Sequence, residues 1–429
     1  MNGDISGLPY WEVEFDQAGA LLRDGGLAAE LNGRPIRDLY VFSHGWNTSQ
    51  SSAQRLYRSM FALIADALPS GSKASTGFAG ILWPSLLFPE DEPATTGPVM
   101  TQGDTLAAPP AAAPGAGPPP SSGKELAAAM ERAFPGRQAE LAELGALLDA
   151  RPQDPDQLER FHALTCALVT SPAQGQEDSG EARAMTSPPG LVFDSMASLA
   201  PQTQQAQGFN PFEKLWAGAR ETLRALSYYE MKNRAGVVGR DGLGPLLAHL
   251  AGGGLRVHLM GHSFGARLAS YALLNLPAPT PVKSLFLIQA AFSHFAFARQ
   301  APVNAGSGAL STLTGRVDGP LVCTFSTFDR ALSWWYPTAS RFAGQDAQAV
   351  ESLNFRWGAL GFDGYQHQGG DVTDAALSPR GHAYDFQPGR FYRLDANSVV
   401  NRRLSLLAGA HSDIEKQEIA WAAISAAGI

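Results

Sequence analysis

The chain has 429 residues, of which 45% are hydrophobic and 17% are charged, so it can bury a large core and is not a disordered charged tail. Its formal net charge is −8 at pH 7 and no cluster of Lys and Arg stands out, which argues against a nucleic-acid partner. Two cysteines, Cys166 and Cys323, are too few for a disulfide framework, and we expect Cys323 to be a buried free thiol.

The N-terminus lacks the basic and apolar regions of a secretory signal, and no run of about 18 apolar residues occurs. We therefore expect a cytoplasmic protein without a transmembrane segment, although a trimmed signal would leave the same sequence. No His, Cys or acidic residues show the spacing of metal ligands, so the sequence indicates neither a metal nor another cofactor. It does not indicate an oligomeric state.

Short apolar runs separated by helix-length segments predict a mostly parallel sheet covered by helices on both faces, which is an α/β fold. The first run, residues 11–15, alternates apolar and polar residues as a half-exposed edge strand does. Residues 414–427 predict a closing helix. The other runs that we expect to form strands are 39–42, 78–82, 257–260, 285–288, 321–325 and 391–394.

The sheet pattern is interrupted by an insertion, residues 86–209, which begins with a flexible Ala/Pro-rich stretch at 93–120. Residues 124–169 predict two helices, because apolar side chains repeat there at helical spacing. The apolar side chains of these two helices are Leu141, Leu144 and Leu148, then Leu158, Phe161 and Leu164. The polar stretch 171–190 is expected to lead back to the core.

The chain then returns to the sheet pattern. Residues 212–226 predict a helix with a core-facing apolar stripe. We therefore divide the chain into a first part of the core at 1–85, the insertion at 86–209 and a second part of the core at 210–429.

The strongest motif is Gly-His-Ser-Phe-Gly at residues 261–265, between an apolar strand and a helical pattern. A serine on such a turn adopts strained backbone angles, and glycines two positions away on either side let strand and helix approach closely. We predict that Ser263 is a nucleophile; the alternative is an ordinary tight turn or a decayed site. The adjacent His262 is expected to point away from Ser263 and to be structural.

Upstream, the strand at 39–42 runs into Ser-His-Gly-Trp-Asn at 43–47, which is typical of the loop that supplies an oxyanion-hole donor. We expect the backbone N–H groups of Trp46 and Phe264 to stabilise the oxyanion. His44 is expected to hold this loop by hydrogen bonds; the alternative is a plain loop with a buried histidine.

The acid of a triad follows the nucleophile in this architecture, and the histidine follows the acid. Asp329 comes just after the strand at 321–325, at the sheet edge where ligands bind, and we predict it as the acid. An alternative role for Asp329 is to cap a helix. Asp318 and Asp363 are its rivals.

The predicted base is His411, in the loop between the last strand and the final helix. His382 is the main competitor. Asp413, two residues after His411, is expected to cap the final helix.

These motifs together resemble the α/β-hydrolase superfamily, which contains esterases, lipases and related acyl hydrolases. The likeness covers residues 10–85 and 210–429, and it is nearest to bacterial members whose oxyanion loop reads His-Gly-Trp/Tyr-Asn. Residues 229–236 also look like theirs. The resemblance implies an α/β-hydrolase fold in which the insertion contains a cap over the active site.

The expected function is hydrolysis of a carboxylic ester, with a small-molecule or lipid-like acyl substrate and an acyl-enzyme intermediate. We expect the aromatic residues Trp334 and Trp335 to bind substrate; the alternative for each is ordinary core packing. The competing functions are a peptidase or amidase with the same triad, and a non-catalytic binding protein with the same fold.

Overall fold

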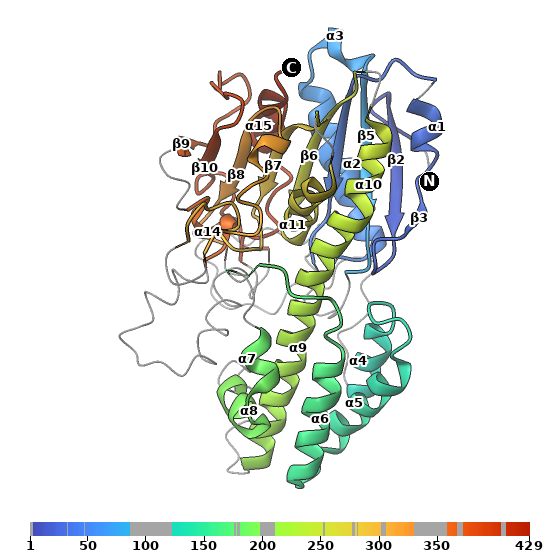
Figure 1. Cartoon of the computed structure of the whole chain (residues 1–429), viewed down its shortest axis with the longest axis vertical. Helices are drawn as coiled ribbons and strands as arrows, with labels where there is room; N and C mark the ends of the chain where they lie inside the picture. Colours follow the sequence, from blue (N-terminus) through green and yellow to red (C-terminus); the bar gives the residue numbers. More distant parts are fainter. Residues whose placement is uncertain are drawn as a thin grey trace.

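The computed structural model has an upper lobe built on one sheet and a lower lobe made of helices (Figure 1). It describes residues 3–31, 33–46, 48–85, 122–175, 177, 181–197, 211–251, 254–276, 279–280, 282–301, 306–329, 358–366, 372–404 and 409–429. The boundaries predicted for the insertion, residues 86 and 209, lie outside these ranges.

The strands of the described residues form one mixed, mostly parallel sheet. They are β1 (Gly3–Ile5), β2 (Leu8–Phe15), β3 (Leu21–Arg23), β4 (Asp38–Ser43), β5 (Thr76–Leu82), β6 (Arg256–His262), β7 (Val282–Ile288), β8 (Leu321–Phe325), β9 (Val372–Ala376) and β10 (Phe391–Asp395). Their order is β1-β2-β5-β4-β6-β7-β8-β10-β9, with β3 paired to β2. The two pairs β1–β2 and β2–β3 are antiparallel and the others are parallel, so the predicted α/β class is confirmed.

One strand prediction is wrong. Residues 11–15 do not form a half-exposed edge, because β2 lies between β5 on one side and the short strands β1 and β3 on the other. Glu12, one of the polar residues of the alternating pattern, is buried and accepts hydrogen bonds from the Tyr10 hydroxyl at 3.3 Å and the Gln54 amide at 3.0 Å. Partners supplied by tertiary structure therefore bury a carboxylate that the local pattern places in water.

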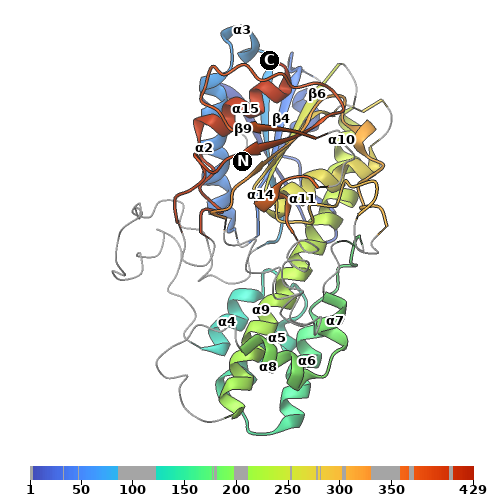
Figure 2. The ribbon, with the colours of Figure 1, turned by 90° about the vertical axis from the view of Figure 1, so that its left-hand side faces the viewer.

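Helices cover both faces of the sheet (Figure 2). Leu39 and Val41 on β4 pack into the core on the side of α9 and α11, whereas Tyr40 and Phe42 pack into the core on the side of α2 and α15. The helices are α1 (Leu27–Leu31), α2 (Gln50–Ala67), α3 (Ser70–Lys73), α4 (Gly123–Met130), α5 (Gln138–Ala150), α6 (Pro155–Ala167), α7 (Glu181–Thr186), α8 (Pro189–Ala197), α9 (Pro211–Val237), the π-helix η4 (Val238–Leu243), α10 (Gly244–Leu250), α11 (Phe264–Tyr271), the 3₁₀-helices η5 (Ala272–Asn275) and η6 (Thr314–Arg316), α14 (Leu360–Asp363) and α15 (Gln417–Ala427).

The lower lobe consists of α4–α8 packed against the first part of α9 (Figure 1). Helices α5 and α6 match the two apolar sets of the predicted helices, but residues 123–130 form a further helix, α4, that was not predicted. The polar connection expected at 171–190 is wrong for residues 181–186, which form α7. This short helix is fixed by a tertiary contact, because the His162 ring on α6 bonds the Ala184 carbonyl at 3.0 Å.

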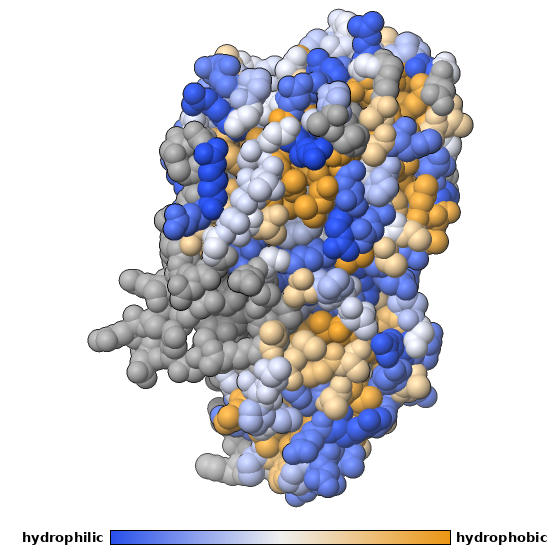
Figure 3. All heavy atoms as spheres, viewed as in Figure 1, coloured by the Kyte–Doolittle hydropathy of each residue, from blue (hydrophilic) through white to orange (hydrophobic). Residues whose placement is uncertain are grey.

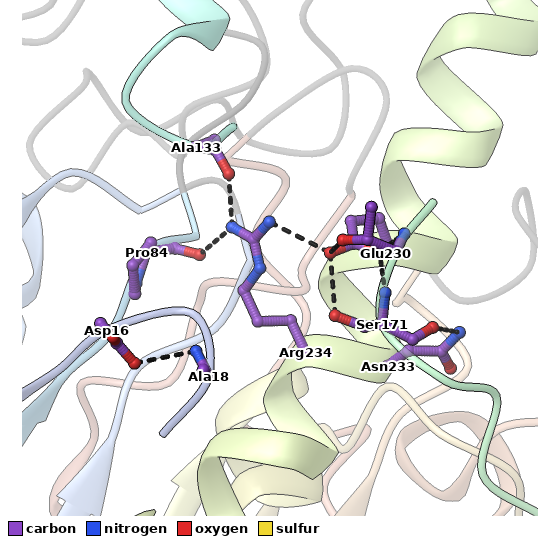
Figure 4. A network of polar contacts seen from close by, with 9 residues as sticks. Asp16, Ala18, Pro84, Ala133, Ser171, Glu230, Asn233 and Arg234 are labelled. Carbon is purple, nitrogen blue, oxygen red and sulfur yellow. Dashed lines mark hydrogen bonds and ion pairs between the residues drawn. The ribbon is translucent and has the colours of Figure 1, made fainter. Parts of the chain in front are cut away.

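A buried ion pair on α9 joins the two lobes (Figure 4). Arg234 Nη2 lies 3.1 Å from Glu230 Oε1. Arg234 Nη1 also donates to the carbonyls of Pro84, after β5, and Ala133, after α4, at 3.2 and 2.5 Å. Glu230 accepts the backbone N–H of Ser171 at 2.8 Å. The core and two segments of the insertion thus meet at one ion pair.

Hydrophilic and hydrophobic residues are mixed over both lobes on the face shown in Figure 3. The large exposed apolar side chains of the described surface are Leu21, Leu22, Leu191 and Phe328. No helix within the described ranges is both long and apolar enough to cross a membrane.

Candidate active site

Ser263 lies on a strained turn between β6 and α11. Its φ of 57° and ψ of −122° are unusual for a residue with a side chain and cost about 1–3 kcal/mol. Three backbone hydrogen bonds hold this turn: Ser263 N donates to Ile288 O at 3.1 Å, and Ser263 O accepts from Ala266 N at 3.1 Å and from Ala291 N at 3.2 Å. Such strain concentrates at functional sites, and here it falls on the predicted nucleophile.

Three glycines allow the backbone to close around Ser263. A Cβ on Gly261 would lie 2.3 Å from the carbonyl oxygen of Gly265, and one on Gly265 would lie 2.1 Å from the carbonyl oxygen of Ser43. A Cβ on Gly45 would lie 2.6 Å from the Ser263 Cβ. Any larger residue would push strand, helix and loop apart, so the glycines set the shape of the site.

His44 is buried and holds the loop after β4. Its Nδ1–H donates to the Gly45 carbonyl at 2.9 Å, and its ring stacks on Trp83 with centroids 5.5 Å apart. The Tyr57 hydroxyl accepts the His44 N–H at 3.0 Å. Burial lowers the pKa of His44 to about 4, so the ring is neutral at pH 7. These contacts are those expected of a residue that fixes the loop.

Each predicted oxyanion donor belongs to a residue that is next in the chain to Ser263 or to a residue packed on it. Phe264 follows Ser263, and Trp46 follows Gly45, which packs directly on Ser263. Their side chains contact each other with ring centroids 6.3 Å apart, and both contact Tyr228. The oxyanion role of their N–H groups stays a prediction, and Asn47 of the same loop lies outside the described residues.

Asp329 and His411 form a buried hydrogen-bonded pair, although they are 82 positions apart in the chain. His411 Nδ1 lies 2.7 Å from Asp329 Oδ2. Their loops are joined by backbone contacts as well, because Asp329 and Gly409 form an antiparallel bridge and Ala410 N donates to Phe328 O at 3.0 Å. The pairing leaves Nε2 of His411 as the nitrogen that can accept a proton.

Ser263 is linked to this pair through its neighbour. His262 Nε2–H donates to the His411 carbonyl at 2.9 Å, and the two rings lie 4.8 Å apart. Burial, followed by the nearby His411, lowers the pKa of His262 to about 3. Within the described part of the chain no hydrogen bond joins Ser263 Oγ to the His411 ring, whose Nδ1 bonds to Asp329.

The rival residues either bond to other partners or are exposed. Asp363 pairs with His294, whose Nδ1 lies 2.8 Å from the Asp363 Oδ1. Asp318 pairs with Lys283. His382 is exposed on the surface. His411 is thus the histidine that bonds to Asp329.

The prediction that Asp413 caps the final helix is wrong. Helix α15 begins at Gln417, and the residue before it, Lys416, makes no side-chain cap bond. Asp413 instead accepts the N–H of Arg402 at 3.0 Å and pairs with Lys416 at 2.6 Å. It therefore orders the loop that carries His411.

A cavity of about 90 Å³ lies beside the loop of His44. Its wall includes the rings of His44 and Trp83 and, from the insertion, Arg132, whose guanidinium donates to the Gln50 amide at 3.0 Å. Ser263, Asp329 and His411 are not among the residues of this wall. The predicted substrate-binding residues Trp334 and Trp335 lie outside the described residues.

Sequence reasoning did not single out Gln289, although its amide bonds Asp329 at 3.1 Å. Its position just after β7 was the available signal. Over the residues described, no group of three or more His, Cys, Asp or Glu side chains could hold a metal ion, and both cysteines are free.

Comparisons with known proteins add no relative. No protein-family model, curated protein or solved structure matches this chain.

Proposed function

We propose that the protein is a serine hydrolase of the α/β-hydrolase fold that cleaves a carboxylic ester. The observation that carries this proposal is the strained turn at Ser263, which closely packed glycines surround, beside the buried pair of Asp329 and His411. Both features lie beyond the carboxyl ends of parallel strands, where ligands bind in open α/β sheets.

The proposed reaction begins when Ser263 Oγ attacks the ester carbonyl and its proton passes to His411 Nε2. Asp329 keeps the other ring proton on Nδ1 and stabilises the imidazolium. The N–H groups of Phe264 and Trp46 stabilise the negative oxygen. The alcohol leaves with the proton from His411, and water, activated by His411, then releases the acid from Ser263.

The substrate that we propose is a small-molecule or lipid-like acyl ester. The exposed ring of Phe328, next to Asp329, supplies apolar surface at the carboxylate of the pair. The cavity beside the loop of His44 has a wall to which both lobes contribute.

Hydrolysis of p-nitrophenyl esters of increasing chain length tests the proposal. Ser263→Ala is expected to lower kcat/KM by at least about 10⁴-fold, because loss of the nucleophile removes the covalent route. A fluorophosphonate should form an adduct that peptide mapping places on Ser263. Ser270→Ala is the matched control, because Ser270 is a buried serine of α11 whose hydroxyl donates to the Ala266 carbonyl.

The other outcomes separate the competing functions. Ester hydrolysis by Ser263→Ala at the wild-type rate would refute the proposed nucleophile. Cleavage of p-nitroanilides or peptides without cleavage of esters would identify an amidase. A folded wild type that forms no adduct and cleaves no substrate would indicate a binding protein.

A further inference from the structure

Gln289 has the same unusual backbone feature as Ser263. The described residues with a side chain and a positive φ are Ser6, Arg151, Ser263 and Gln289. Ser6 and Arg151 are exposed, at a tight turn and a helix end, where this conformation is common. Gln289, with a φ of 44°, is fully buried just after β7, which pairs with β6, the strand that precedes Ser263. Strained backbone angles at a buried residue persist only where the surrounding structure holds them, and such residues cluster at functional sites.

The side chain of Gln289 is oriented by hydrogen bonds at both amide atoms. The Gln289 N–H donates to Thr324 Oγ1 at 3.2 Å, so that hydroxyl directs its own proton to Gln289 Oε1 at 3.0 Å. The amide NH₂ must then face the other way. It donates to the Gly361 carbonyl and to Asp329 Oδ2, each at 3.1 Å.

The backbone of Gln289 is locked as well. A Cβ on Gly361 would lie 2.4 Å from the Gln289 carbonyl carbon, so α14 packs directly on the strained residue. Gly361 N also donates to Ala290 O at 2.9 Å. The surrounding structure therefore holds Gln289 in a conformation that it would not adopt by itself.

Asp329 Oδ2 accepts hydrogen bonds from two donors, His411 Nδ1 at 2.7 Å and Gln289 Nε2 at 3.1 Å. We propose that Gln289 is a positioning residue of the active site, whose amide fixes the Asp329 carboxylate in the orientation that receives the Nδ1–H of His411. The inference rests on the proposed function, in which that bond sets the tautomer of the base. Without the amide, the carboxylate loses one of the donors that orient it, and the direction of its bond to His411 is less well fixed.

Two neutral substitutions test this role. Gln289→Leu keeps similar volume without the hydrogen bonds, and Gln289→Asn keeps an amide that is too short to reach Asp329. We expect both to lower kcat by about 10- to 100-fold, a cost typical of losing a hydrogen bond that orients a functional side chain, while KM changes little. Asparagine tolerates a positive φ better than glutamine does, so a purely backbone role predicts full activity for Gln289→Asn.

Gln289→Glu gives a signature in the pH profile. Two carboxyl groups in contact cannot both be ionised, so the introduced group has a raised pKa and is protonated at lower pH. In that form it donates to Asp329 as the amide does, and activity is expected to be retained. Above its pKa it ionises and repels Asp329, so kcat should fall on the alkaline side, where the wild type does not lose activity.

His294→Gln is the matched control, because His294 is buried after the same strand and bonds Asp363 instead of Asp329. It should reduce stability without the loss of kcat. Wild-type kcat in Gln289→Leu and Gln289→Asn, or a pH profile of Gln289→Glu that matches the wild type, would overturn the inference.

A measurement without substrate separates this inference from the proposed function. The proton between His411 and Asp329 should give a far-downfield NMR resonance in the wild type and in His294→Gln. Its shift or loss in Gln289→Leu supports the positioning role, even if the wild type hydrolyses no ester. An unchanged resonance in that variant contradicts it.

Discussion

At two places of the described sheet a serine, a histidine and an aspartate lie close together, and we propose that one of these groupings is the active site. Near the amino ends of the strands, His258 Nε2 lies 2.9 Å from Asp38 Oδ1 and His258 Nδ1 lies 3.0 Å from Ser284 Oγ. Beyond the carboxyl ends, Ser263 lies near the pair of Asp329 and His411. Strand β6 contributes to both groupings, His258 near its start and Ser263 just past its end.

The difference lies in the backbone. Ser284 lies inside strand β7 and its hydroxyl bonds to His258, whereas Ser263 lies past the end of β6 on a strained turn. Arg256, 2.7 Å from Asp38, also engages the carboxylate of the amino-end grouping. We therefore expect the grouping around His258 to serve stability, and we propose a catalytic role for the grouping at Ser263.

Identical substitutions of the two aspartates should give the largest contrast. Asp329→Asn is expected to lower kcat by about 10⁴-fold with little change in stability, because the base loses its correct tautomer. Asp38→Asn is expected to leave kcat within twofold but to lower the free energy of unfolding by about 2–3 kcal/mol. Ester kinetics and urea unfolding measure both effects. Equal loss of kcat in the two variants would contradict the distinction.

A methyl group at Gly45 tests the role of the backbone. Gly45→Ala places a carbon 2.6 Å from the Ser263 Cβ, so the loop must move away from the nucleophile. We expect kcat to fall by about 10²- to 10³-fold, the usual cost of a lost oxyanion donor. Gly71→Ala is the control, since a Cβ there meets no atom within 4 Å. Wild-type kcat in Gly45→Ala would show that this close approach is not needed.

The buried neutral histidines predict a smaller, pH-dependent effect. Burial lowers the pKa of His258 despite its bond to Asp38, and the pKa values of His44 and His262 are about 4 and about 3. Below about pH 6.5 these histidines bind protons in the unfolded chain but not in the folded protein. Their contribution to the free energy of unfolding is therefore present above that pH and is lost as the pH falls.

Each histidine should contribute up to about 1.4 kcal/mol per pH unit. Urea unfolding at pH 7.5 and pH 5 measures the slope, and His258→Gln should reduce it. His382→Gln, at an exposed position, should not. Equal slopes in the two variants would show that His258 is not the neutral residue that the structure indicates.

Apolar runs predicted strands correctly where the signal lies within one short stretch of sequence. Runs such as 39–42 and 321–325 are buried strands because both faces of a parallel sheet are covered. The three-residue strands β1 and β3 carry too little pattern to be recognised, and without them β2 looks like an edge. The environment of Glu12 depends on partners that sequence alone does not reveal.

The site shows the same limit. The turn at Ser263 is visible in sequence because glycine spacing and chain order encode it locally. The pairing of Asp329 with His411 follows from chain order and position, and the structure places the two in contact. No sequence motif marks Gln289, because its proposed role depends on a hydrogen bond to Asp329, which follows a different strand. Asp413 looks like a cap only if α15 is assumed to begin earlier than it does.

The place of the helical lobe in the chain has a consequence for folding energetics. Strand β5 ends at Leu82 and β6 begins at Arg256, so the whole lobe interrupts one connection of the sheet. The entropy of closing a loop grows only with the logarithm of its length, by about 0.6 kcal/mol per doubling, so roughly 170 residues cost the sheet only a few kcal/mol more than a short crossover. Buried residues such as Phe161, Phe193 and Trp216 give the lobe apolar contacts that offset this cost. An α/β sheet can therefore accept a large insertion here while its own strands keep their register.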